Sequence, residues 1–202
     1  MSFFDNQKVL GYAFLVVGLI LVIDAILTIV FGFVDVNDDM KEGIDNWTIY
    51  CVLGGIGSLI CAVLYTMFAM KVYNGVYSEK IVILERYVMI VGLTIALGGI
   101  FNAVASIAGG QDVGVAIVSA ILSILIGLII MFIATKINDG KQTVGDSIIW
   151  ILLLIAFIIV LILSIFMLFS LATIIDGIAH IIIALFMIAF LFDADVKKKM
   201  NM

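Results

Sequence analysis

Long runs of apolar residues alternate with short polar clusters along the chain. A membrane-spanning helix needs about 20 mainly apolar residues, and the polar clusters divide the chain into segments of about that length. The last apolar run, residues 147–192, is about twice as long as one span requires, so we divide it at a turn near residues 169–171. The connection at residues 71–86 has room for a short helix of its own. The pattern predicts six spans, at residues 9–33, 48–70, 87–108, 113–135, 147–168 and 171–192.

Small residues repeat in two of these spans. When residues 48–70 are aligned with residues 113–135, two triplets of small residues spaced four apart coincide. Such residues line one helix face and let a neighbouring backbone approach closely, so we expect them to form helix-packing seams. We interpret the alignment as tandem two-helix hairpins at about residues 1–78, 79–143 and 144–202, with chance alignment of Gly-rich helices as the alternative. The seam residues are Gly54, Ser58 and Ala62 in the second span and Ser119, Ser123 and Gly127 in the fourth.

The layout of three hairpins with short loops and no soluble domain is similar to that of the HdeD-like family of small bacterial membrane proteins. The resemblance covers the number of spans and the Gly-containing hairpins. That family tends to carry Pro after its odd-numbered helices, whereas this chain contains no Pro. The resemblance therefore implies an architecture, and no residue role follows from it.

The composition fits a chain that lies almost wholly within a membrane. Hydrophobic residues make up 65% and charged residues 12% of the 202 residues, against about 45–50% and 25% in globular domains. A soluble enzyme is excluded, because so much apolar surface cannot be buried in a chain of this size. Disorder is excluded too, because disordered chains are polar. We therefore expect an all-α integral membrane protein, with residues 1–202 as one transmembrane domain.

The basic residues predict the orientation of the chain, because cytoplasmic loops collect Lys and Arg. With an even number of spans, both termini lie on one side together with the second and fourth loops. Of the ten Lys and Arg, nine fall on that side and only Lys41 on the other. We expect both termini in the cytoplasm, and the compact loops suit a prokaryotic plasma membrane. The nine are Lys8, Lys71, Lys80, Arg86, Lys136, Lys141, Lys197, Lys198 and Lys199.

Three ionisable residues lie inside the predicted spans: Asp24 in the first, and Asp176 and His180 in the sixth. Ionisable groups in hydrocarbon are costly and mark a functional site or a buried pairing. Asp176 and His180 are four residues apart, so they share a helix face. The helical rise places Asp24 and His180 about 14 Å, and Asp176 about 8 Å, from the outer ends of their predicted helices. The three would meet if these helices were neighbours, with Asn102 near the same level.

This polar cluster has two interpretations. It could relay protons or cations, with His180 titrating near neutral pH. It could instead be a satisfied set of interhelical contacts that fixes helix register, which is the commoner role. A metal or haem site is disfavoured, because the chain has a single His and no paired ligand spacing. We therefore expect neither a metal nor a cofactor.

Two polar segments outside the spans are candidates for weak ion or lipid contacts. In the first outer loop, Asp35, Asn37 and Asp39 match positions 1, 3 and 5 of an EF-hand loop, while positions 6 and 12 do not match. Attraction of cations there competes with a plain solvated acidic loop. Three lysines directly after the last span predict contact with anionic lipid headgroups. They are Lys197, Lys198 and Lys199.

The sequence carries no motif for a nucleophile and its base, for phosphate or dinucleotide binding, or for nucleic acid. We expect no enzymatic activity and no nucleic-acid partner. The first hypothesis is a small multi-pass membrane protein that acts through helix packing or through self-association as a homo-oligomer. The alternative is a small proton- or cation-coupled transporter or channel that uses the cluster of Asp24, Asp176 and His180.

Overall fold

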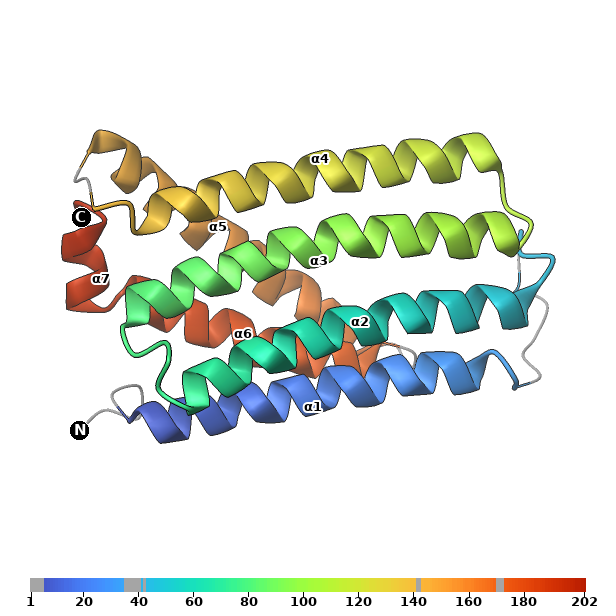
Figure 1. Ribbon diagram of the computed structural model, residues 1–202, viewed down its shortest axis with the longest axis horizontal. Helices are drawn as coiled ribbons and strands as arrows, with labels where there is room; N and C mark the ends of the chain where they lie inside the picture. The colour runs from blue at the N-terminus through green and yellow to red at the C-terminus, as the bar shows by residue number, and fades with distance from the viewer. Residues whose placement is uncertain (1–5, 35–40, 42, 141–142, 170–172) are drawn as a thin grey trace.

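The described part of the chain is all-helical, and its two termini lie at the same end of the molecule (Figure 1). The computed structural model describes residues 6–34, 41, 43–140, 143–169 and 173–202, and these contain no strand. The helices are α1 (Gln7–Phe31), α2 (Trp47–Tyr73), α3 (Lys80–Ala108), α4 (Val113–Ile137), α5 (Val144–Met167), α6 (Ile174–Leu191) and the short α7 (Ala194–Lys199). We call the end that carries the termini the termini end, and the opposite one the far end.

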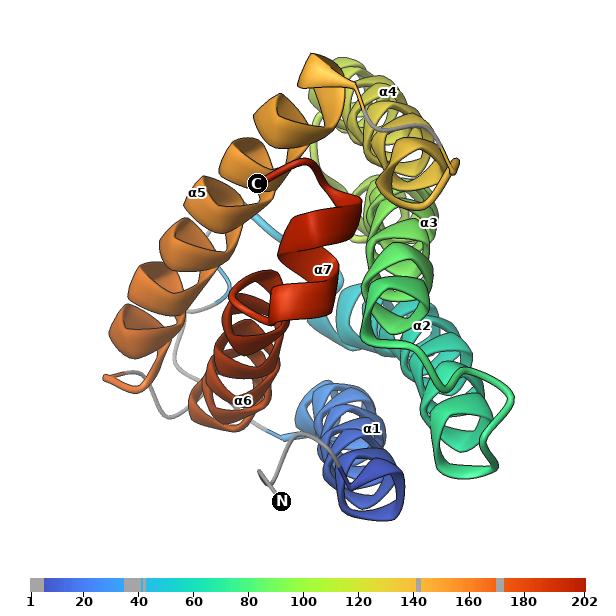
Figure 2. The same ribbon diagram turned by 90° about the vertical axis from the view of Figure 1, so that its left-hand side faces the viewer.

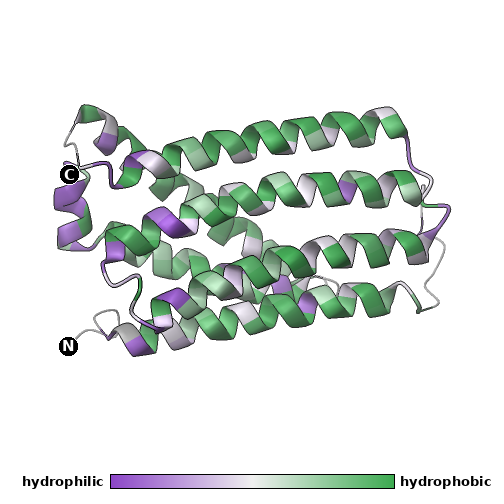
Figure 3. Ribbon diagram, in the orientation of Figure 1, coloured by the Kyte–Doolittle hydropathy of each residue, from purple (hydrophilic) through white to green (hydrophobic). Residues whose placement is uncertain are grey.

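Helices α1 to α6 are long and apolar enough to cross a membrane. Hydrophobic residues cover all six along their length, and hydrophilic residues gather at the ends and at a few interior positions (Figure 3). In hydrocarbon, backbone N–H and C=O groups must be hydrogen-bonded within the protein, and a helix does this by itself. The prediction of an all-helical fold with six helices long and apolar enough to span a membrane is confirmed.

Helix boundaries differ from the prediction mainly at the termini end. The expected polar connection at residues 71–86 is largely helical, because α2 continues to Tyr73 and α3 begins at Lys80. A helix stops where its carbonyls are capped, and the end of apolar sequence does not mark that point. Here Gly75 has φ +76°, and the N–H of Val76 donates to the carbonyl of Lys71 at 2.9 Å, which closes α2 in a Schellman turn.

The last connection also differs from the prediction. Helix α5 ends at Met167 and α6 begins at Ile174, three residues later than expected, while residues 170 and 171 of the expected turn lie outside the described residues. The short helix α7 was not predicted. Val196 and Met200 attach this segment to the protein, and both are fully buried. Two apolar side chains in a lysine-rich tail are too weak a pattern to predict a helix there.

Helix α1 packs antiparallel on α2 through buried small residues spaced seven apart. A Cβ atom at Gly18 would stand 2.7 Å from the Thr66 hydroxyl oxygen of α2, closer than real Cβ atoms come. A heptad of small residues keeps one helix face against its partner and lets the two backbones approach closely. The residues are Gly11, Gly18, Ala25 and Gly32.

Helix α3 packs on α4 in the same way. A Cβ at Gly92 would stand 2.7 Å from the carbonyl oxygen of Gly127, and a Cβ at Gly127 would collide with the carbonyl of Gly92. Seven residues further along α3, Gly99 lies against the side chain of Ser123. Ser123 and Gly127, two of the expected seam residues of α4, are thus in close contact with α3, whereas Ser119 is exposed.

The expected seam on α2 is not continuous. No atom of another element lies within 4 Å of where a Cβ of Gly54 would stand, and Ser58 is exposed, while Ala62 is buried. Helix α2 approaches its neighbours closely at Gly55, which faces Ala25 and Ile29 of α1, and at Gly57, which faces Phe101 of α3. Small residues occur on several faces of this Gly-rich helix, so spacing alone does not identify the face that packs.

Helix α6 lies between α1 and α5, opposite the row formed by α1 to α4 (Figure 2). In the half of the molecule nearer the termini, aromatic rings from five helices fill the centre. The Phe14 ring lies 5.5 Å from those of Phe68 and Phe186, between centroids, in geometries favourable for aromatic pairs. We call this group the aromatic cluster: Phe14, Tyr65, Phe68, Tyr87, Phe157, Phe186 and Phe190.

Helix α7 ties the chain end to the start of α3. Asp193 forms an ion pair with Lys80, and Lys199 pairs with Glu79 at 2.5 Å. Lys197 lies over the ring of Phe192 at 4.8 Å from its centroid. Lys197 and Lys199, both expected to meet lipid headgroups, therefore also contact protein groups.

We predict that Gly127→Ala destabilises the protein, because the added methyl group would overlap the carbonyl of Gly92. Overpacking of this kind costs about 1–3 kcal/mol. The thermal unfolding midpoint in detergent should fall accordingly. Gly54→Ala is the matched control, since its methyl group enters open space; an equal loss in both variants would contradict the assigned seam.

We also predict a pH-dependent attachment of α7. Partial burial disfavours the charge of Asp193, but hydrogen bonds from the Lys80 ammonium and the Asp195 N–H outweigh burial and lower the pKa of Asp193 from its ordinary value of 3.8. A lowered pKa means that the stabilisation is present above the ordinary value and lost as pH falls through the folded value. Backbone amides of α7 should therefore exchange more slowly than in Asp193→Asn at pH 6, with the difference shrinking as the pH falls below the ordinary value of 3.8.

Asn is the appropriate replacement for this test because it can still cap α7 while it removes the charge. A difference between the two proteins that persists unchanged at the lowest pH would show that the ion pair is not what holds α7.

Candidate intramembrane cation site

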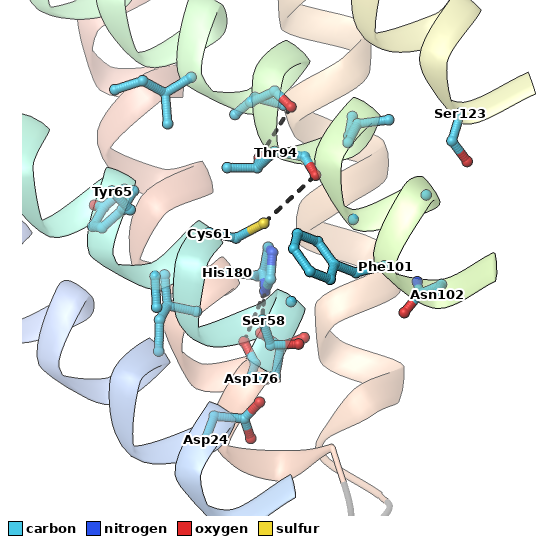
Figure 4. A pocket seen from close by; sticks show the side chains of 18 of the residues that line it. Asp24, Ser58, Cys61, Tyr65, Thr94, Phe101, Asn102, Ser123, Asp176 and His180 are labelled. Carbon is cyan, nitrogen blue, oxygen red and sulfur yellow. Dashed lines mark hydrogen bonds and ion pairs between the residues drawn. The ribbon is translucent and has the colours of Figure 1, made fainter. Parts of the chain in front are cut away.

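A cavity of about 510 Å³ lies between α1, α2, α3 and α6 (Figure 4). It is lined by all three ionisable residues that the sequence places inside the spans, Asp24, Asp176 and His180, and by Asn102 of α3. Helix α1 contacts both α2 and α6, which brings the two ends of the sequence together around the cavity. The condition set by the sequence, that the first and sixth helices are neighbours, is met.

His180 and Asp176 form a pair on one face of α6. Nδ1 of His180 lies 2.9 Å from the carbonyl oxygen of Asp176 and 3.1 Å from its carboxylate Oδ1. Both oxygens accept hydrogen bonds, so Nδ1 carries the hydrogen and Nε2 is left to bind a proton or a ligand donor. Asp176 lies in the first turn of α6, where the helix dipole favours a negative charge.

Asp24 reaches the cavity from α1. Its carboxylate makes no hydrogen bond or ion pair with any residue that the structure describes, and it is only half-buried because it borders the cavity. From the observed helix bounds, Asp24 lies about 10 Å from the far end of α1 and His180 about 9 Å from the start of α6. Asp24 lies beside Asp176 at this end of the cavity, and His180 lies one helical turn further along α6 (Figure 4).

The cavity changes in character toward the termini end. Tyr65 and Tyr87 line it there, with ring centroids 6.4 Å apart. Tyr65 is only 5% exposed, and its hydroxyl has no hydrogen-bond partner among the described residues. Between the tyrosines and the acids, the Cys61 thiol donates to the carbonyl of Thr94 at 3.7 Å. The cavity thus has an acidic end and an aromatic end.

A second cavity, of about 670 Å³, lies between α2, α3 and α4 at the far end. We call it the far-end groove; Tyr50, Ser106, Gln111, Asp112 and Ser119 are among its lining residues. It shares Gly99, Asn102 and Ser123 with the first cavity. Asn102 and Ser123 therefore lie where the two spaces adjoin.

The other predicted site residues lie elsewhere. Asp35, Asn37 and Asp39 fall outside the described residues. Lys197, Lys198 and Lys199 belong to α7 at the termini end, away from the cavity. No group of three His, Cys, Asp or Glu side chains in the described ranges could hold a metal ion.

Sequence reasoning missed the aromatic end of the cavity. Tyr65 and Tyr87 each add a single hydroxyl to a mainly apolar helix. The residues next to them in the sequence do not indicate that both side chains line the same cavity. Cys61 and Thr94 were missed for the same reason, because a single small polar residue in a span is usually a packing residue. The signal that was available is the intermediate polarity of Tyr, which is commonly hydrogen-bonded when buried.

No protein-family model, curated protein or solved structure matches this chain. The functional argument therefore starts from the cavity and its residues.

We predict that the thiol of Cys61, which borders the cavity, reacts faster with cationic than with anionic reagents. In a Cys51→Ala background, Cys61 should react about tenfold faster with a cationic trimethylammonium methanethiosulfonate than with the anionic sulfonate reagent, after each rate is normalised to that of a free thiol. Asp24→Asn should reduce this ratio. A faster anionic reagent, or no reaction of Cys61 with either, would contradict the assigned lining and its charge.

Proposed function

We propose that the protein takes up protons or other cations in the intramembrane cavity and moves them across the membrane. Supporting this is the carboxylate of Asp24, which lies within a membrane-spanning helix, borders the cavity and has no partner among the described residues. A charged carboxylate in hydrocarbon is costly, and such residues pair with another group or line a path for ions. Binding of a proton or cation would supply the missing partner.

The charges around the cavity favour a cationic ligand. Among the residues that line it, none is Lys or Arg. The acids are Asp24 and Asp176, and within the described part of the chain only Asp176 forms an ion pair, with His180. With His180 neutral the site carries two negative charges, and with His180 protonated it carries one. In both states a cation is attracted and an anion is repelled.

The pair on α6 also suits proton transfer. Nε2 of His180 can take a proton while Nδ1 keeps its hydrogen bonds to Asp176, and the resulting imidazolium is stabilised by the adjacent carboxylate. Asp24 of α1, which lines the same cavity, is a further group able to accept a proton. The cluster therefore contains a carboxylate, an imidazole and a second carboxylate on two adjacent helices.

The orientation is part of the proposal. Nine of the ten Lys and Arg belong to the side of the termini, which supports a cytoplasmic termini end in a prokaryotic plasma membrane. The far-end groove would then face the outside. The lysines of α7 would lie at the cytoplasmic surface, where anionic headgroups attract them.

Packing or self-association alone, the first hypothesis from the sequence, explains the small-residue seams and leaves the cavity without a role. In a packing cluster that fixes helix register, each carboxylate would be expected to have a hydrogen-bond or ion-pair partner. The carboxylate of Asp24 has neither within the described chain. No catalytic activity is proposed; the thiol of Cys61, which borders the cavity, donates a hydrogen bond to the backbone carbonyl of Thr94.

The proposal predicts ion flux in proteoliposomes. With an imposed pH gradient and the membrane potential held at zero, purified protein should dissipate the gradient faster than empty liposomes do, and Na⁺ and K⁺ should be assayed in parallel. Asp24→Asn and His180→Ala should each reduce the excess flux at least about tenfold, since each removes a titrating group from the path.

Asp139→Asn is the matched control, because it removes one acid at the termini end, beside Lys136 and outside the cavity. Unfolding midpoints close to that of the unmodified protein would show that the variants fold. Flux no greater than in empty liposomes, or full flux in Asp24→Asn, would overturn the proposal.

A further inference from the structure

We propose that the ligand of the cavity is a monovalent organic cation with an apolar body, admitted from the far end. This inference rests on the proposed function and names its substrate class. The positive group would lie among Asp24, Asp176 and His180, and the apolar body would lie against Tyr65 and Tyr87.

The size of the cavity favours a molecule over a bare ion. Sites for small molecules measure about 300–1,000 Å³, and the cavity has about 510 Å³. A water molecule or a dehydrated monovalent ion needs only about 30 Å³. Among the described residues, no group of three His, Cys, Asp or Glu side chains is close enough together to surround a small metal ion.

Polarity changes along the length of the cavity, and this gives the ligand a direction. Asp24 lies about 10 Å from the far end of α1, whereas Tyr87 lies about 10 Å from the termini end of α3. The tyrosine end also presents the apolar side chains of Leu21, Ile90 and Ile183. An ammonium or similar group fits the acidic end, and aromatic faces attract cations and pack against apolar groups.

Tyr65 adds an observation of its own. Its hydroxyl is buried without a partner among the described residues, although a buried donor left unpaired costs about 1–3 kcal/mol. The hydroxyl has almost no accessible surface, so a ligand in the cavity would meet the ring of Tyr65 and not its oxygen.

The monovalent charge of the ligand follows for the state in which His180 is protonated. When His180 is protonated, its pair with Asp176 is neutral, and Asp24 remains as the single uncompensated charge. One negative charge beside an apolar wall matches a monovalent cation. A divalent cation would need a second free acid at the same level.

The access route follows from what adjoins the cavity at each end. At the far end, Asn102 and Ser123 border both the cavity and the far-end groove, which is lined mainly by small and polar residues. At the termini end, the aromatic cluster closes the interior, with Phe14, Phe68 and Phe190 fully buried. A ligand can therefore approach the acids from the far end and stops at the rings.

The test compares two probes of the same shape and opposite charge, tetraphenylphosphonium and tetraphenylborate. Equilibrium dialysis of the full-length protein in an uncharged detergent should show saturable binding of tetraphenylphosphonium at one site per chain. Tetraphenylborate should bind at least tenfold more weakly. Asp24→Asn should weaken tetraphenylphosphonium binding about tenfold, Tyr87→Leu severalfold, and Asp139→Asn not at all.

A measurement on the unmodified cavity residues guards against misfolded variants. Bound tetraphenylphosphonium should protect Cys61 from thiol reagents in the Cys51→Ala protein, because Cys61 lies between the acids and the tyrosines. Equal binding of both probes, no protection of Cys61, or competition by tetramethylammonium at the same concentration as tetraphenylphosphonium would overturn the inference.

The two proposals fail separately. Saturable, Asp24-dependent binding of tetraphenylphosphonium without any ion flux would overturn the transport function and support the organic-cation site. Asp24-dependent proton flux in a protein that does not bind tetraphenylphosphonium would support transport and overturn the organic-cation site.

Discussion

The arrangement of this protein depends on the close approach of helix backbones at buried small residues. Lipid tails are as apolar as Leu side chains, so helices in a membrane gain little from hiding apolar surface from one another, and tight van der Waals packing has to hold them together. The heptad that includes Gly18 and Ala25 joins α1 to α2, and the contact of Gly92 with Gly127 joins α3 to α4. Two closely packed antiparallel pairs result, and the remaining helices are arranged around them.

The same contacts set the position of the polar site. Ala25 is fully buried against α2, and successive residues on a helix point about 100° apart. Asp24 is therefore turned away from the seam toward the interior, where α6 packs on α1 (Figure 4). Helix α6 is held mainly by α1 and α5 and touches α3 little, so a space remains between α3 and α6. The rotation of α1 about its own axis therefore determines both the seam with α2 and the position of Asp24 at the edge of the cavity.

The sequence predicted the features that rest on rare or sustained signals. Six long apolar runs identify the spans, and Asp24, Asp176 and His180 stand out because ionisable residues are uncommon in such runs. Features that depend on which helix faces which could not be predicted. Gly55 packs on α1 and Gly54 does not, although the two are adjacent and chemically identical, because only the pairing of helices decides which face is buried. The extension of α2 to Tyr73 was missed because capping, and not hydropathy, ends a helix.

The two ends of the molecule have different physical roles in any transport cycle. At the far end, small and polar residues adjoin the cavity, so a ligand meets little resistance there. At the termini end, rings from five helices interlock, and the Trp150 indole N–H donates to the carbonyl of Leu191 at 2.7 Å, which fixes α5 against α6. The ion pair of Asp193 with Lys80 then holds the end of α6 to the start of α3. Passage toward the termini requires the rings to separate, and α6 can move from α3 only if this ion pair breaks. The polar contacts of α7 therefore oppose opening on that side, while the glycine seams keep each helix pair together as a unit.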